Sequence, residues 1–181
     1  PNYYRFCESL HEAGATVVLT SREAARAETS AAQLPGAAKH HGIVLDQMDP
    51  SSIERGWNEA LSRAGRIDVL VNNGHEALAA DWTTVTAEQF SRQLANATAY
   101  FLLARLTRDH AVSRKASASI VMLGSMYGLV GSYPDAYAGI TNASPVAYHT
   151  LKGGILHMTR HLAVYWAGDG VWRSMAENRR R

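Results

Sequence analysis

Cysteine is almost absent from this sequence of 181 residues, because Cys7 is the only one. A single thiol cannot form a disulfide within the chain, and chains without disulfides are typical of reducing compartments. We therefore expect a cytoplasmic location. We do not expect Cys7 to be a catalytic thiol.

The sequence also lacks long apolar runs and a strong excess of either charge. No stretch approaches the roughly 20 apolar residues that a membrane-spanning helix needs, and residues 1–6 show no signal-peptide pattern. The formal net charge of +2 is too small to indicate binding to nucleic acid or to an anionic membrane. The basic run at residues 179–181 is short, and we interpret it as a solvated chain end.

What is present is an alternation of two periodicities in a chain of ordinary globular composition, with 46% hydrophobic and 19% charged residues. Short apolar and β-branched runs predict buried strands, and longer segments with helical spacing separate them. This alternation predicts one α/β domain with a doubly wound parallel sheet. The predicted strands are residues 16–20, 42–45, 67–71 and 118–123, and the predicted helices are residues 6–13, 22–34, 50–64, 87–114 and 146–167.

The last predicted helix opens with Tyr148 and Lys152, which lie one helical turn apart and so share a face. A free tyrosine has a pKa of about 10, and a neighbouring ammonium lowers that pKa because it favours the phenolate. Such a pair can act as general acid and general base near neutral pH. Taken alone, the motif is a weak signal, because such pairs arise by chance on many helices and more often are a surface tyrosine beside a surface lysine.

Polar residues elsewhere place this pair in context. The Asn-Asn-Gly turn at residues 72–74 follows the third strand, Asn96 lies inside the long helix, and Ser125 follows the fourth strand, where parallel sheets bind ligands. In this order they resemble the short-chain dehydrogenase/reductase family, whose pattern is Asn-Asn-Ala-Gly, a helical Asn, a Ser after the next strand, and Tyr-x-x-x-Lys. The resemblance covers residues 6–171. It implies a Rossmann-like fold and hydride transfer between a nicotinamide cofactor and a carbonyl or alcohol.

The resemblance also implies a role for each residue. Tyr148 would donate a proton to the carbonyl oxygen during reduction and take it back during oxidation, and Ser125 would orient that oxygen by a hydrogen bond. Lys152 would lower the pKa of Tyr148 and hold the nicotinamide ribose. Asn96 would bind a water that links Lys152 to solvent as a proton relay, although an exposed helical asparagine is the alternative.

The segment between Ser125 and Tyr148 is longer than is usual for the family, and residues 131–145 contain the extra length. This insertion resembles the gluconate 5-dehydrogenase-like branch, which implies a polar, sugar-like or polyol substrate. Tyr127, Tyr133 and Asp135 could line the substrate pocket or could anchor the loop.

Ser21 and Arg22 follow the strand predicted at residues 16–20, at a position that meets the adenosine ribose in this fold. No acidic residue stands there to accept from the 2′-hydroxyl of NAD, whereas Arg22 could pair with the 2′-phosphate of NADP. We therefore predict NADP, with NAD possible; Arg22 could instead cap the next helix. By resemblance, Asp46 would accept from the adenine amino group, with Gln47 alongside.

The same resemblance implies that Asn72 and Gly74 let the backbone approach the adenosine ribose, although His75 stands where the family has glycine. Two departures are larger. Nothing before Phe6 matches the first strand and its glycine-rich loop, and residues 172–181 match nothing in the family. We therefore expect a partial domain over residues 1–171, a non-matching tail at residues 172–181, and no C-terminal strands.

The missing first strand would be central in the strand order 3-2-1-4-5-6. Without it, the two halves of the sheet would either pair directly or leave their facing edges unpaired. We therefore interpret the chain as a fragment.

A second function is compatible with the sequence, namely a catalytically inactive module for binding or oligomerisation. The helices predicted at residues 87–114 and 146–167 form the dimer face in the family and predict a homo-oligomer. His157 and His161, one turn apart, could in principle bind zinc, but without a third ligand we interpret them as packing or interface residues and expect no metal.

Overall fold

The computed structural model describes residues 2–36, 39–78, 80–136, 138–139 and 145–177. The chain divides into two compact units, Pro1–Ile67 and Asp68–Arg181. Its five described strands form two parallel sheets, β1-β2 in the first unit and β3-β4-β5 in the second.

The first unit follows the local signals of its sequence closely. The carboxylate of Asp49 accepts a hydrogen bond from the backbone N–H of Ser51 at 2.9 Å, and Pro50 occupies the first turn of α3. Gly65 ends this helix with a φ of 75°, a conformation that favours glycine. The elements of this unit are α1 (Asn2–Glu12), β1 (Val18–Ser21), α2 (Ala24–Ala32), β2 (His41–Val44) and α3 (Pro50–Ala64).

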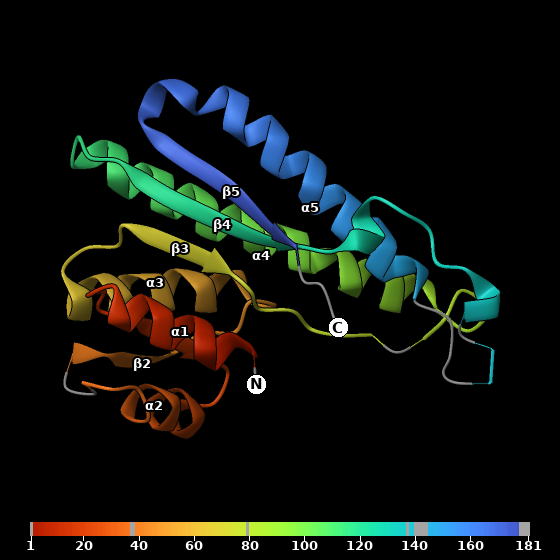
Figure 1. Ribbon diagram of the computed structural model, residues 1–181, viewed down its shortest axis with the longest axis horizontal. Coiled ribbons are helices and arrows are strands. Elements are labelled where there is room, and N and C mark those ends of the chain that lie inside the picture. Colours follow the sequence, from red (N-terminus) through yellow and green to blue (C-terminus); the bar gives the residue numbers. More distant parts are fainter. Residues whose placement is uncertain (1, 37–38, 79, 137, 140–144, 178–181) are drawn as a thin grey trace. The chain divides into compact units, whose positions relative to one another are not determined.

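The second unit contains the two longest helices (Figure 1). A capping box starts the first of them, because the Thr86 hydroxyl accepts from the Gln89 N–H and the Gln89 side chain accepts from the Thr86 N–H. The elements are β3 (Val69–Asn72), α4 (Ala87–Ser113), β4 (Ala118–Gly124), the short 3₁₀ helices η2 (Met126–Gly128) and η3 (Pro134–Ala136), α5 (Val146–Tyr165), η4 (Ala167–Asp169) and β5 (Val171–Glu177).

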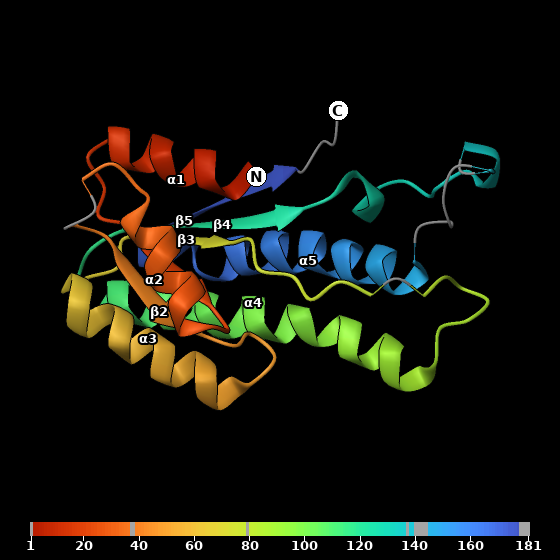
Figure 2. The same ribbon diagram turned by 90° about the horizontal axis from the view of Figure 1, so that it is seen from below.

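The core of the second unit lies between its sheet and its two long helices. Strand β4 is central, and α4 and α5 lie on the same side of the three strands (Figure 2). The buried side chains come from β4, α4, α5 and the start of β5: Tyr100, Ala104, Ala111, Ala118, Ile120, Met122, Leu151, Ile155, Leu162 and Val171. Residues of β4 point alternately into this core, so the strand fixes the register of both helices.

The structure corrects the predicted tail. Strand β5 begins at Val171 and pairs in parallel with β4 over its full length, so a further C-terminal strand is present where a non-matching segment was expected from residue 172. Val171 is buried in the core cluster, which anchors the start of the strand. Backbone pairing along β4 stabilises this segment whatever its side chains are, and the sequence pattern did not reveal it. Residues 178–181, including the basic run, lie outside the described residues.

The described strands fall into two sheets, and the prediction of one domain stays a prediction. The ladders pair β1 with β2 and β3 with β4, and the first strand that the family places between the two halves is not among the five described. The parallel pairing and the strand–helix alternation are confirmed. Of the helices in the described residues, none is long and apolar enough to span a membrane.

Candidate functional site

The candidate site lies at the carboxyl ends of β3 and β4, where the sequence analysis expects it. Asn72 is the last residue of β3, and Ser125 follows directly on Gly124 at the end of β4. Helix α5 starts at Val146, so Tyr148 and Lys152 lie in its first two turns. Loops and helix starts at this edge can carry reactive side chains while the sheet holds them in place.

Burial and a hydrogen bond to β4 fix the position of Lys152. Its side chain is buried, and its Nζ donates a hydrogen bond of 2.7 Å to the backbone oxygen of Leu123 on β4. The same Nζ lies 5.7 Å from the ring centroid of Tyr148 and 5.7 Å from that of Tyr100. Burial lowers the pKa of Lys152 from 10.5 to about 8, because the charged form loses hydration. The ammonium is therefore mostly charged at neutral pH and loses its proton at mildly alkaline pH.

Tyr148 faces two further rings. The centroid of its ring is 5.3 Å from that of His75 in an edge-on arrangement, and 6.5 Å from that of Tyr127 in η2. Helix η2 can approach α5 this closely because Gly128 has no side chain. A Cβ at Gly128 would lie 2.8 Å from the carbonyl oxygen of Lys152. The close approach brings the segment after β4 against the first turns of α5.

Ser125 is buried, and its Oγ accepts a hydrogen bond of 3.2 Å from the backbone N–H of Tyr127. This bond caps η2 and orients the side chain. A serine hydroxyl that accepts one bond can still donate its own proton. Ser125 can therefore offer a proton to an oxygen atom bound beside it.

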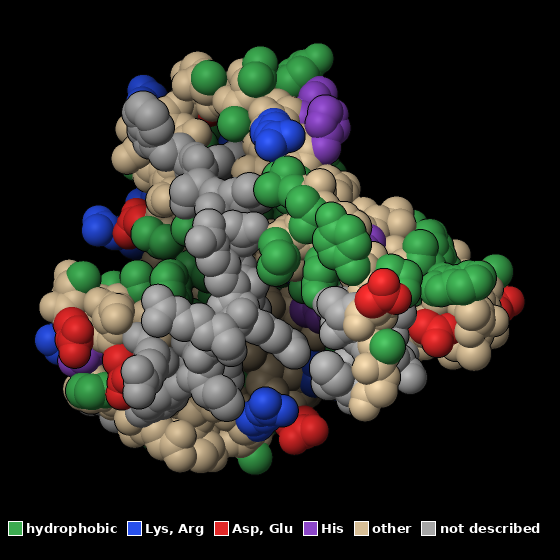
Figure 3. Space-filling view, turned by 45° about the vertical axis from the view of Figure 1, so that its right-hand side comes forward, with side chains coloured by type: hydrophobic (Ala, Val, Ile, Leu, Met, Phe, Trp, Pro, Cys, Tyr) green, Lys and Arg blue, Asp and Glu red, His purple; other side chains and the backbone are tan. Residues whose placement is uncertain are grey.

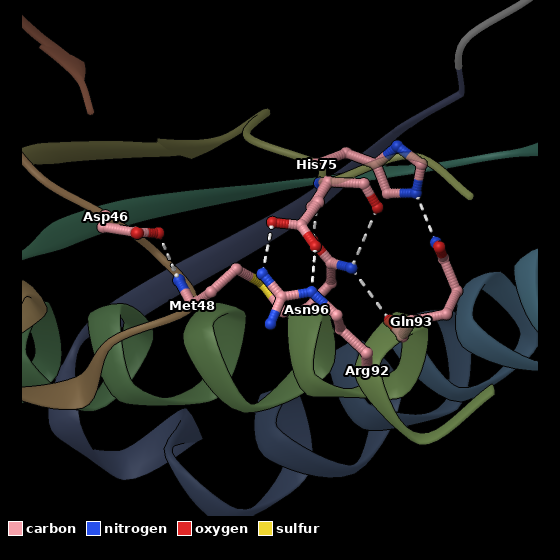
Figure 4. A network of polar contacts seen from close by, with 7 residues as sticks. Asp46, Met48, His75, Arg92, Gln93 and Asn96 are labelled. Carbon is pink, nitrogen blue, oxygen red and sulfur yellow. Dashed lines mark hydrogen bonds and ion pairs between the residues drawn. The ribbon is translucent and has the colours of Figure 1, made fainter. Parts of the chain in front are cut away.

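Asn96 is fully buried in α4, so the alternative of an exposed helical asparagine is wrong. Its Oδ1 accepts from the backbone N–H of Glu76 at 2.8 Å, and its Nδ2 donates to the backbone oxygens of Gln93 at 2.8 Å and Glu76 at 3.3 Å (Figure 4). A salt bridge between Arg92 and Glu76 adds a second link. Asn96 thus holds the segment after β3 against α4. The predicted water relay through Asn96 stays a prediction.

His75 was noted in the sequence only as a departure from the family turn, yet it lies within this site. Its Nε2 is 2.6 Å from the side-chain nitrogen of Gln93 (Figure 4). Its ring also contacts the ring of Tyr148 edge-on. Burial and, to a smaller extent, the nearby positive charge of Lys152 lower the pKa of His75 to about 4, although the charge of Glu76 acts in the opposite direction. The imidazole is therefore neutral at neutral pH, and Lys152 is the cation beside Tyr148.

Of the two residues predicted to approach the adenosine ribose, Asn72 has a structural role at the end of β3. The buried amide of Asn72 donates to the backbone oxygen of Tyr100 at 3.0 Å, which links β3 to α4. Gly74 lies in the exposed segment between Asn72 and His75. Their predicted contact with an adenosine ribose is untested.

The predicted residues for the adenosine end of a cofactor lie in the first unit. Ser21 ends β1, and its Oγ accepts from the Glu23 N–H at 3.2 Å; Arg22 follows it and is exposed. After β2, a carboxylate oxygen of Asp46 accepts from the Met48 N–H at 2.9 Å, and Gln47 lies between them, half-buried. Asp46 thus orders its own loop, and its predicted contact with adenine stays a prediction.

The structure brings Tyr148 and Lys152 together and packs the segment after Ser125 against them. Of the three residues suggested to line a pocket, Tyr127 contacts Tyr148, whereas Tyr133 and Asp135 are exposed. Part of the predicted insertion, residues 137 and 140–144, lies outside the described residues. Tyr100 also belongs to this site and was not predicted, although its position one turn after Asn96 places it on the same face of α4.

Comparisons with known proteins show which proteins this chain resembles. Residues 4–175 match the family described as short chain dehydrogenase. The chain is 33% identical over 173 residues to galactitol 2-dehydrogenase (L-tagatose-forming) of Cereibacter sphaeroides, an alignment that covers 91% of this chain and 61% of the relative. It is 32% identical over 160 residues to an inactive 2-(S)-hydroxypropyl-CoM dehydrogenase 2 of Xanthobacter autotrophicus, covering 88% and 64%. The chain thus spans less than two thirds of the length of these relatives.

Solved structures confirm the predicted Rossmann-like α/β fold. A sorbitol-6-phosphate 2-dehydrogenase from Erwinia amylovora matches with a TM-score of 0.78 at 27% identity, covering 91% of this chain and 62% of that structure. A short-chain dehydrogenase from Streptomyces avermitilis matches with a TM-score of 0.77 at 24% identity, covering 94% and 58%. The matched family segment ends at residue 175, four residues past the expected limit of residue 171, in agreement with strand β5.

Proposed function

This chain belongs to the short chain dehydrogenase family, and on that premise we propose that it is an oxidoreductase, or the larger part of one. The proposed reaction is hydride transfer between NADP and a small carbonyl or alcohol compound. The observation that carries the proposal is the buried Lys152 ammonium beside the ring of Tyr148, in the segment of α5 that follows Ser125 and β4.

The donor groups of the site suit the nicotinamide end of the cofactor. An ammonium has three N–H donors, and Lys152 directs one of them to the Leu123 oxygen, so its chemistry allows further bonds to a ribose diol. The cofactor supplies or accepts the hydride when it is bound. The protein's own residues then have to hold the substrate oxygen and move one proton.

In reduction, the phenol of Tyr148 donates its proton to the substrate oxygen, and in oxidation the phenolate takes that proton back. The positive charge of Lys152 beside the ring electrostatically favours the phenolate that forms when the proton leaves. Ser125 donates a hydrogen bond to the same substrate oxygen. Asn96 holds the segment that carries His75, and a water relay through Asn96 remains a proposal.

For the cofactor, we propose NADP on the chemistry of Ser21 and Arg22, with NAD as the alternative. Both follow β1, where the guanidinium of Arg22 could pair with a 2′-phosphate. Asp46, Gln47, Asn72 and Gly74 complete the proposed set. Arg22→Ala should weaken NADPH binding at least tenfold and NADH binding little, measured by the fluorescence of the bound nicotinamide. Equal weakening of both cofactors would exclude this role for Arg22.

For the substrate, we propose a small polyol, diol or sugar-like alcohol and the corresponding ketone, as in the gluconate 5-dehydrogenase-like branch. Galactitol, D-threitol and meso-2,3-butanediol appear in the names of related dehydrogenases, which supports this class. The loop after Ser125 also exposes apolar side chains, and hydrophobic groups gather on the face that Figure 3 turns toward the viewer. The exposed apolar residues of this loop are Met126, Leu129, Val130 and Tyr133.

The test compares the chain with Tyr148→Phe, which removes the phenolic oxygen and keeps the ring. NADPH binding is measured by fluorescence, and turnover is followed with a panel of polyols, diols and ketoses. We expect the parent chain to show turnover. Tyr148→Phe should lower this turnover by at least a hundredfold with little change in NADPH binding. Binding without turnover would favour the inactive binding module, and full activity of Tyr148→Phe would exclude the mechanism. Neither binding nor turnover would mean that this chain alone is not the functional protein.

We also propose that the protein is cytoplasmic and forms homo-oligomers through α4 and α5. Both helices expose apolar side chains near their C-terminal ends, namely Val112, Val164 and Tyr165. Light scattering of the purified chain should give a multiple of its mass of 19.7 kDa. A monomer at all concentrations would contradict the interface.

A further inference from the structure

The ammonium of Lys152 lies between two aromatic rings that come from different helices. Tyr148 belongs to α5 and Tyr100 to α4, and Nζ is 5.7 Å from each ring centroid. Both distances are within the range of about 6 Å in which the face of a ring attracts a cation. The one hydrogen bond described for Nζ goes to the Leu123 oxygen on β4.

This arrangement supplies the compensation that a buried charge requires. Lys152 is 5% exposed, and within the described part of the chain no carboxylate forms an ion pair with it. A buried ammonium without an anionic partner tends to lose its proton. One backbone carbonyl and two ring faces are therefore the groups that favour its charged form.

We propose that Tyr100 is a positioning residue, whose ring face holds the Lys152 ammonium in place and in its charged form beside Tyr148. The role rests on the ring and not on the phenol. The hydroxyl of Tyr100 is buried and has no hydrogen-bond partner among the described residues, and the side chain is 2% exposed. Its burial raises the pKa of Tyr100, so this phenol stays protonated and takes no part in proton transfer.

The role of Tyr100 deepens the proposed function and rests on it. Three groups that can titrate or carry charge face Lys152: Tyr100 from α4, Tyr148 from α5, and His75 from the segment after β3. His75 is neutral at neutral pH, so it neither replaces nor cancels the charge of Lys152. Weakening the contact with Tyr100 would therefore discharge Lys152 at a lower pH and remove the positive charge beside Tyr148 in that range.

The test measures the titration of Lys152 directly, without cofactor or substrate. The chain has only three lysines, Lys39, Lys115 and Lys152, so carbon-labelled lysine should give three resolvable side-chain signals in NMR. Tyr100→Phe keeps the ring and removes the hydroxyl. The matched variant carries a ring-fluorinated phenylalanine at position 100, which keeps the size of Phe but weakens the negative face of the ring. The same fluorinated residue at Phe101, whose ring lies under Arg105, is the control.

We expect the pKa of Lys152 to be unchanged in Tyr100→Phe and lowered by about 0.5 to 1.5 units in the fluorinated variant, the range of a desolvated cation–π contact. The Phe101 control should leave the signal unmoved. Equal titrations in the Phe and fluorinated variants would overturn the role of the ring. A Tyr100→Phe titration as low as that of the fluorinated variant would overturn it as well, because the hydroxyl would then be responsible.

An active protein adds a second readout, the pH profile of turnover. Its high-pH limb should move down by the same amount in the fluorinated variant and stay in place in Tyr100→Phe. The titration separates this inference from the proposed function. If the titration of Lys152 shifts in the fluorinated variant but the chain is inactive, the inference is retained and the proposed function is rejected. If the titration does not shift but the chain is active, the inference is rejected and the proposed function is retained.

Discussion

Replacing Lys152 by Met should make the protein more stable at neutral pH while it destroys the proposed site. The reason is the energetic cost of burying an ammonium without an anionic partner. The pKa of Lys152 falls from 10.5 to about 8 on folding because of burial. At about 1.4 kcal/mol per pKa unit, this drop corresponds to roughly 3 kcal/mol of lost stability where the lysine is charged in both states.

The cost depends on pH in a defined direction. Between the folded value of about 8 and the unfolded value of 10.5, the unfolded chain binds this proton more tightly, so the free energy of unfolding rises with pH in that window. The penalty is about 3 kcal/mol at about pH 7 and about 1 kcal/mol at about pH 10. Met also leaves the Leu123 oxygen without its donor, at a cost of about 1–2 kcal/mol. The net gain should be about 1–2 kcal/mol at about pH 7 and none at about pH 10.

Urea unfolding followed by tryptophan fluorescence at the two pH values measures this gain. Lys39→Met removes the same charge from an exposed side chain and should change the free energy of unfolding by less than about 0.5 kcal/mol at either pH. A Lys152→Met variant that is less stable than the parent at neutral pH would refute the reasoning. So would a variant whose free energy of unfolding differs from that of the parent by the same amount at both pH values.

The remaining predictions concern the groups around Lys152. Gly128→Ala should cost about 1–3 kcal/mol in urea unfolding, because its Cβ would meet the Lys152 backbone at 2.8 Å, whereas Gly131→Ala, with nothing within 4 Å, should show no steric cost. Asn96→Leu should cost about 2–4 kcal/mol by the same assay, since it leaves buried backbone groups unpaired; a loss below about 1 kcal/mol would show that Asn96 does not hold the neighbouring loop. The NMR signal of the His75 ring should titrate near pH 4, and its protonation should lower stability as pH falls from about 6.5 toward 4; a midpoint near 6.5 would mean that the ring is exposed.

Most elements of the fold were predictable because they depend on neighbouring residues. The apolar run at residues 118–123 became β4, and Asp49 with Pro50 marked the start of α3. Strand β5 was not predictable in this way. Its stability comes from pairing with β4, which lies far away in the sequence, and the predicted boundary at residue 171 fell at its first residue.

In the candidate site, too, the features that depend on nearby residues were predictable and those that depend on distant contacts were not. Helical spacing alone places Tyr148 and Lys152 on one face, and the end of a strand places Ser125 at the edge of the sheet. The spacing did not show that Asn96 is buried, nor that its amide is bonded to Glu76. Those bonds depend on how the segment after β3 folds back on α4.

The sequence by itself determined the order of the first four strands and of the helices around them, the parallel α/β class and the pairing of Tyr148 with Lys152, because periodicity and spacing act over a few residues. Only the tertiary structure decided that Tyr100 lies against Lys152, that His75 meets Tyr148, and that the strands form two sheets. These features join elements that are distant in the chain. Their energies come from burial and long-range contacts, which leave no local pattern in the sequence.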